Sequence, residues 1–342
     1  EAGNKAETYV AQVGDTKYAT LKEAIAAANA GDTVTLLAHV NLMTSTQAIS
    51  KQLTIDLNGK TISSTAYRTI QINADADLTV KDTASGGKIT NAYIGSSYPS
   101  TIYLKGTGAK FTLESGTIES DPNVTSLQSV AINSEKDMAC TVNINGGSVV
   151  VPEAATDGRA IVASTNSMTL NISGGTITGG LHGEDGANVT ITGGKITARV
   201  GDTGVIKEAY GMRLKGTANV TVAGGEITGV KMDDNGYKGD VPTVKLKSGN
   251  IKGSFYSISK GTIIFDVAEN ADIVLENNSA EQFLPDTVEL VQNADDTYGV
   301  KKTTYVAEVN GTQYETLQEA IKAASTGNTI TLLDDVDLGS SK

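Results

Sequence analysis

Residues 142–149 read VNINGGSV, and this octapeptide decides the fold. An apolar residue stands at every second position, a glycine pair follows, and another aliphatic residue comes after it. Strict alternation predicts a strand with one buried face, and the glycine pair predicts a bend with positive φ or close backbone approach. The other copies are LTVKDTASGGKI (78–89, a looser form), FTLESGTI (111–118), LNISGGTI (170–177), VTITGGKI (189–196), VTVAGGEI (220–227) and VKLKSGNI (244–251).

The spacing of the copies is variable. Their second glycines are separated by as few as 19 residues (Gly175 to Gly194) and as many as 31 (Gly116 to Gly147). This variation indicates fixed strands joined by loops of different length. A further strand precedes the motif in several copies, as in TIYLKG, SVAINS, RAIVAS and YGMRLKG.

Two or three short strands in each coil of about 30 residues predict an all-β parallel β-helix, in which coils bury their apolar residues only by stacking. A β-sandwich is the competing fold. It has no reason to place a Gly-Gly or Ser-Gly pair at the same corner seven times.

The beginning of the chain recurs near its end. Residues 9–42 match residues 305–338 without a gap, and 20 of the 34 positions are identical. Such a match indicates a tandem array. We therefore interpret residues 1–302 as one β-helix unit and residues 303–342 as the beginning of the next.

Each copy also carries a helix signature. A capping box followed by apolar residues at helical spacing predicts capping helices at about residues 20–30 and 316–325. The first helix is expected to close the open end of the first coil. The second is expected to lie between consecutive solenoids, closing the preceding one as well as opening the next.

The order of a capping helix, AGDTVTLL (residues 30–37) and stacked GGxIT coils resembles the right-handed parallel β-helices of the pectin-lyase-like superfamily. More narrowly, it is similar to the tandem β-helix repeats of bacterial surface adhesins. The resemblance implies a right-handed solenoid with an N-terminal capping helix.

For function, the resemblance implies a non-catalytic repeat of an extracellular protein on the bacterial cell surface. Such a repeat acts as a rigid spacer and binds glycans or a surface protein. The superfamily also contains polysaccharide lyases, so a lyase or hydrolase is the alternative. A third hypothesis is a self-assembling filament subunit whose partners are neighbouring copies of the same repeat.

Composition argues against a nucleic-acid partner, a membrane span and an internal disulfide. A formal charge of −12 and a pI near 4.7 argue against nucleic acid, whose phosphates require a basic patch. No apolar stretch approaches 18 residues, so we predict no membrane span. The single cysteine, Cys140, excludes an internal disulfide and is expected to be a buried small hydrophobe.

No catalytic residue is assigned from the sequence. The chain has no tryptophan and two histidines, and we interpret His39 as a solvated loop residue and His182 as part of a solvated glycine-rich turn. Three arginines, at 159, 199 and 213, lie in neighbouring coils only if the register brings them together. None is preceded by the paired acids that a lyase needs.

Tyrosines in loops are the ligand-binding candidates, because a phenol ring stacks on a sugar or anchors a protein with little loss of entropy. The bland alternative is that these rings pack over the solenoid wall. The candidate residues are Tyr67, Arg68, Tyr93, Tyr98, Tyr210 and Tyr237.

The loop KMDDNGYKGD (residues 231–240) is the one candidate calcium site. Asp233, Asp234 and Asp240 supply oxygens there, but their spacing departs from the EF-hand pattern. Turn formation explains these residues better, so no metal and no cofactor are assigned.

Overall fold

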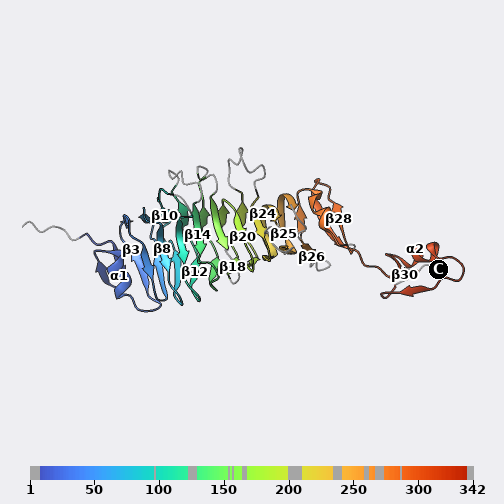
Figure 1. The fold of residues 1–342 in the computed structure, drawn as a ribbon, viewed down its shortest axis with the longest axis horizontal. Helices are drawn as coiled ribbons and strands as arrows, with labels where there is room; N and C mark the ends of the chain where they lie inside the picture. The colour runs from blue at the N-terminus through green and yellow to red at the C-terminus, as the bar shows by residue number, and fades with distance from the viewer. Residues whose placement is uncertain are drawn as a thin grey trace, which may run out of the picture.

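Short strands that recur three to a coil build a long parallel β-helix (Figure 1). The computed structural model describes residues 8–95, 98–121, 129–152, 155, 158–163, 168–198, 210–233, 241–257, 262–265, 273–285 and 287–336, with the backbone alone at 233, 257, 263 and 265. Within the stack of coils, strands pair in parallel with the equivalent strands of the neighbouring coils. The all-β parallel solenoid predicted from the glycine motif is confirmed.

The coils stack into three faces. Face 1 contains the motif strands: β3 (Thr33–Leu36), β6 (Leu53–Asp56), β9 (Asp77–Lys81), β12 (Lys110–Leu113), β15 (Thr141–Ile144), β18 (Thr169–Ile172), β21 (Asn188–Ile191), the first parts of β24 (Asn219–Asp233) and β25 (Thr243–Ser257), and β26 (Thr262–Phe265).

Face 2 follows the glycine pair and contains β4 (Val40–Asn41), β7 (Thr61–Ser64), β10 (Lys88–Asn91), β13 (Thr117–Ser120), β16 (Ser148–Val150), β19 (Thr176–Thr178), β22 (Lys195–Thr197), the middle parts of β24 and β25, and β27 (Ile273–Leu275). Face 3 contains β5 (Gln47–Ile49), β8 (Arg68–Ile72), β11 (Ser100–Leu104), β14 (Val130–Ser134), β17 (Arg159–Ala163), β20 (Leu181–Gly183), β23 (Met212–Lys215) and the last parts of β24 and β25.

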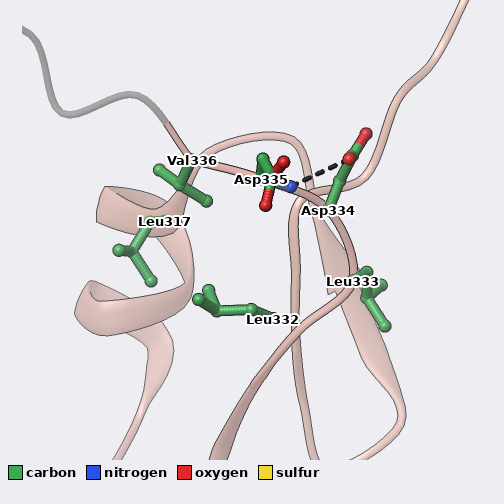
Figure 2. Close-up of a pocket in the computed structure, with 6 residues that line it drawn as sticks. All are labelled: Leu317, Leu332, Leu333, Asp334, Asp335 and Val336. Atoms are coloured by element: carbon green, nitrogen blue, oxygen red, sulfur yellow. Dashed lines mark hydrogen bonds between the residues drawn. The ribbon is translucent and has the colours of Figure 1, made fainter.

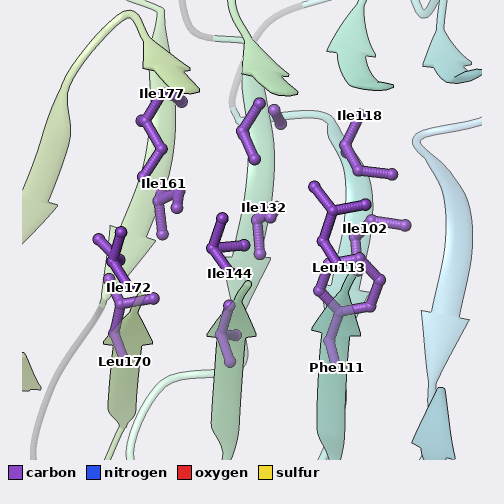
Figure 3. Packing of buried hydrophobic residues seen from close by; sticks show 14 of the residues in the cluster. Ile102, Phe111, Leu113, Ile118, Ile132, Ile144, Ile161, Leu170, Ile172 and Ile177 are labelled. Atoms are coloured by element: carbon purple, nitrogen blue, oxygen red, sulfur yellow. The ribbon is translucent and has the colours of Figure 1, made fainter. Parts of the chain in front are cut away.

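The core is built from rows of aliphatic side chains. On face 3, Ile102, Ile132 and Ile161 are paired neighbours in successive coils, and all are fully buried (Figure 3). Phe111 and Leu170 occupy the equivalent row of face 1 on either side of Val142. Alternation places these residues inside, and burial of their apolar surface is the main favourable term for stacking.

The outward positions of face 1 carry a ladder of polar side chains. The amide of Asn171 donates to Asn143 Oδ1 at 2.9 Å, and the amide of Asn143 donates to Thr112 Oγ1 at 3.2 Å. These side chains satisfy one another from coil to coil, as cross-strand polar pairs do.

Glycines form the corner between faces 1 and 2. Gly147, Gly175 and Gly194 have φ of +69°, +73° and +80°. A Cβ atom at Gly175 would lie 2.7 Å from the carbonyl oxygen of Gly146 in the coil below. The motif therefore requires glycine for two reasons, its left-handed conformation and the close approach of stacked backbones.

The N-terminal segment consists of β1 (Ala11–Val13), β2 (Thr16–Tyr18) and α1 (Leu21–Ala27). Thr20 and Glu23 make the predicted capping box, and α1 ends where Ala28 turns extended, so the helix is shorter than the expected 20–30. Leu21 and Ile25 join the hydrophobic cluster of the first coils. The helix is confirmed, whereas its role as a cap stays a prediction.

The other end of the solenoid is covered by η1 (Asn278–Phe283) and the antiparallel hairpin β28 (Val288–Gln292) and β29 (Tyr298–Lys302). Ala280 and Val288 are buried in the solenoid's cluster. These elements occupy the place that the sequence led us to expect for a helix over residues 316–325.

Residues 307–332 instead form a second small unit with its own core. It contains β30 (Ala307–Val309), β31 (Thr312–Tyr314), α2 (Leu317–Ala323) and β32 (Ile330–Leu332), and it lies beyond the hairpin in Figure 1. Because α2 packs on β30, β31 and β32, the expectation that this helix also closes the preceding solenoid was wrong.

The corner geometry predicts the effect of two matched substitutions. Gly175→Ala and Gly86→Ala both place a Cβ at similar positive φ, but nothing lies within 4 Å of the Cβ at Gly86. Left-handed strain costs each variant about 1–2 kcal/mol. The backbone clash should cost Gly175→Ala about 1–3 kcal/mol more in urea unfolding, and equal losses would contradict the stacked corner.

The separate cores predict the effect of truncation. Deleting residues 305–342 removes no member of the solenoid's cluster, and the ion pair between Lys301 and Glu315, at 3.8 Å, is exposed and worth little. The melting temperature of the solenoid should therefore stay within about 3 °C of the full chain, measured by circular dichroism. A larger drop would show that the second unit supports the first.

Candidate functional site

The outward positions of face 3 form a row with one side chain from each coil, which we call the outer row. Its register follows from strand pairing, and each member stands between two inward positions of its strand, most of them buried aliphatic residues. Neighbours in such a row are about 4.8 Å apart. The outer row consists of Gln71, Tyr103, Asn133, Val162, His182, Arg213, Lys231 and Tyr256.

The N-terminal end of the outer row is an aromatic group built around Arg68. The guanidinium carbon of Arg68 lies 3.2 Å from the ring centroid of Tyr103 and 5.7 Å from that of Tyr67. The rings of Tyr67 and Tyr93 meet edge to face at 5.4 Å. Three of the predicted ligand-binding residues, Tyr67, Arg68 and Tyr93, are thus brought together, and Tyr67 is exposed.

Tyr103 belongs to this group but was missed from the sequence. Burial raises the pKa of Tyr103, and the charge of Arg68 partly offsets that effect. The sequence signal that identifies Tyr103 is an aromatic residue at the outward position between Ile102 and Leu104 in TIYLKG. A cation held against a ring face is favourable, and it keeps Arg68 in a fixed orientation.

Tyr98 lies beside this group with a left-handed backbone, at φ of +47°. The guanidinium carbon of Arg159 is 5.4 Å from its ring centroid, and the ring is exposed. A second cation–aromatic contact therefore extends the surface from β11 toward β17.

The C-terminal end of the outer row carries a second aromatic group. Tyr210 and Tyr256 stack with ring centroids 6.2 Å apart and an interplanar angle of 21°. The ammonium nitrogen of Lys231 lies 6.0 Å and 5.4 Å from the two centroids. Tyr210 was predicted, whereas Tyr256 and Lys231 follow only from the pairing of β24 with β25.

His182 lies near the middle of the outer row, and the interpretation as a solvated turn was wrong. The residue stands in β20 between Val162 and Arg213 and is 2% exposed. Neither ring nitrogen has a hydrogen-bond partner among the described residues, and Nε2 is 3.8 Å from Glu184 Oε1.

Burial lowers the pKa of His182 well below its usual range, and the charges of Arg159, Lys215 and Arg213 lower it further. The register therefore brings Arg159 and Arg213 to one face with a neutral imidazole between them. Arg199, the third arginine considered, lies outside the described residues.

The structure also describes the other histidine, His39, and the single cysteine, Cys140. His39 is exposed, and its Nδ1 accepts a hydrogen bond from the backbone N–H of Thr61 at 3.0 Å. Cys140 is buried as predicted, and desolvation raises the pKa of its thiol to about 11.

The side chains of the calcium candidates lie outside what the structure describes. Asp234, Asp240 and the ligand candidate Tyr237 fall outside the described residues, and only the backbone of Asp233 is described. Among the described residues, no group of three His, Cys, Asp or Glu side chains is placed to hold a metal ion.

A comparison with protein-family models, curated proteins and solved structures finds no match to this chain. In the described portion, none of the helices has the length and apolar character needed to span a bilayer.

The buried histidine predicts a pH dependence of stability. An unfolded histidine titrates near 6.5, and the folded pKa of His182 is lower, so the unfolded chain binds more protons below pH 6.5. Stability should fall as the pH drops below that value, by up to about 1.4 kcal/mol per pH unit from this residue.

Urea unfolding at several pH values between neutrality and mild acid measures this effect. His182→Leu should flatten the decline. Parallel profiles for the wild type and His182→Leu would show that another group causes the acid sensitivity.

Proposed function

We propose that this chain is a non-catalytic repeat of an extracellular bacterial surface protein, acting as a rigid spacer that binds glycans along face 3. The proposal rests on the resemblance to adhesin repeats, the duplicated segment at residues 305–338, and the surface of the outer row. A stack of coils with satisfied backbone hydrogen bonds suits a stiff spacer.

The observation that carries the binding part is the pair of aromatic and cationic groups at the two ends of the outer row. The exposed rings of Tyr67 and Tyr256 offer flat apolar faces to sugar rings, and each group holds a cation. The six strand-to-strand steps from Tyr103 to Tyr256 cover about 29 Å. An extended chain of several sugars fits this length better than a single sugar.

The charges of face 3 favour an acidic glycan. The protein as a whole carries −12, yet Arg68, Arg159, Arg213 and Lys231 gather on this one face. Charges act over about 8 Å at physiological ionic strength, so a bound carboxylate responds to these cations more than to the net charge.

A polysaccharide lyase or hydrolase is the second candidate. The observation that favours it is that Arg159, His182 and Arg213 lie on one face. Two cationic side chains and a neutral imidazole in this arrangement resemble a cationic site with a neutral base. Its weakness is the burial of His182, whose ring a substrate does not reach in this conformation.

A glycan array probed with the full chain tests the proposal, together with an assay for unsaturated products on acidic polysaccharides. Binding that weakens with salt, without product, is the expected result. Tyr67→Ala and Tyr256→Ala should each weaken binding about three- to tenfold, and Tyr9→Ala, an exposed tyrosine beside β1, should not.

Two results would contradict it. Product formation would show that the chain is a lyase and not a non-catalytic adhesive repeat. Absence of both binding and product would reject glycan binding and leave only the role of a rigid spacer.

A further inference from the structure

The two copies of the duplicated segment have the same local structure. In the first, Ala11 pairs with Tyr18 and Leu36, and in the second Ala307 pairs with Tyr314 and Leu332. Both helices begin with a capping box. Residues 307–336 are therefore a folded duplicate of residues 11–40, at a constant offset of 296.

The copies differ in what covers them. Leu36 is 0% exposed whereas its equivalent Leu332 is 55% exposed, and Ile25 is 6% exposed whereas Ile321 is 57% exposed. The second copy thus leaves uncovered the apolar side chains that the first copy buries.

In the first copy the strand segment that lies beside β3 is residues 51–58, which reads KQLTIDLN. β6 in this segment pairs in parallel with β3, placing Ile55 opposite Val34. Leu53, Ile55 and Leu57 are buried in the same cluster as α1.

Polar side chains of residues 51–58 also donate hydrogen bonds to the first copy. The ammonium group of Lys51 donates to the carbonyl oxygens of Ala26 and Ala28 at the end of α1, at 3.2 and 2.6 Å. A lysine is favourable there because carbonyl groups at a helix C-terminus lack intrahelical partners. The amide of Asn58 donates to the carbonyl oxygen of Leu36 at 2.9 Å.

The second copy retains the receiving surface. β32 is the edge of a three-stranded sheet in the described chain, so one side of it has no strand. Figure 2 shows Leu317, Leu332 and Val336 around the open space between α2 and the end of β32. An unpaired edge beside exposed apolar side chains is a template for strand addition.

We propose that residues 307–336 form a receptor for a parallel β-strand with the chemistry of residues 51–58, supplied by the first coil of another solenoid unit of this repeat. The strand needs a lysine, then aliphatic residues at alternate positions, then an asparagine. The order of contacts is that of the first copy. This interaction is independent of glycan binding on face 3.

A labelled peptide of residues 47–60 added to the full chain tests the proposal. We expect saturable binding by fluorescence anisotropy and slower hydrogen exchange at the amides of β32. Leu332→Asp should lower the affinity at least about tenfold, because it removes buried apolar area, while Val291→Asp on the exposed hairpin should have no effect.

Peptide controls test the chemistry of the strand. A peptide carrying Leu53→Asp and Ile55→Asp should not bind, and one carrying Lys51→Glu should bind more weakly. Equal binding to the wild type and Leu332→Asp, or protection at β3 in place of β32, would overturn the proposal.

A covalent fusion of the strand to the chain tests the same contact even where the free peptide binds weakly. Because Leu42 and Leu338 are equivalent, residues 43–92 can be joined directly after Leu338. Protection of β32 in this fusion, lost in Leu332→Asp, is expected. An unprotected β32 in both the fusion and the peptide mixture would reject the receptor and leave the glycan proposal untouched.

Discussion

The backbone hydrogen bonds between successive coils are the interaction on which the rest of the structure depends. Each coil finds partners for its N–H and C=O groups only in the coils on either side, so all corners must superpose. Between faces 1 and 2 this requirement is met by glycines. The N–H of Thr176 reaches the carbonyl oxygen of Gly147 at 2.9 Å only because no Cβ stands between the stacked bends.

The same requirement makes the two ends of a solenoid special, since a terminal coil has hydrogen-bonding groups and apolar rows with no next coil to cover them. The strand pairing differs at the two ends of this molecule. At the beginning, β1 pairs with β3 in the antiparallel sense, and α1 contributes Leu21 and Ile25 to the hydrophobic cluster. At the other end, β29 turns antiparallel to β27, and η1 supplies Ala280 to the core. Antiparallel pairing interrupts the repeat at both places.

Faces 1 and 2 were predictable from the sequence because alternation and the glycine pair are local patterns. Face 3 was harder. β20 has three residues, Leu181–Gly183, too few to show a period, and the glycines within and around it favour a turn. Burial of His182 depends on Val162 and Arg213, which are 20 and 31 residues away and become neighbours only through the register. Tyr103 and Tyr256 escaped notice for the same reason, because their partners come from other coils.

This dependence on register gives the outer row a simple property. Each coil contributes one side chain, so chemical character changes along the row in steps of about 4.8 Å, independent of loop length. A loop insertion, such as the one that separates the motifs of Gly116 and Gly147 by 31 residues, leaves the steps unchanged. The number of coils between Tyr103 and Tyr256 therefore fixes the distance between the two aromatic groups. Loss or gain of one coil would change that distance by one step while the core rows stay in contact.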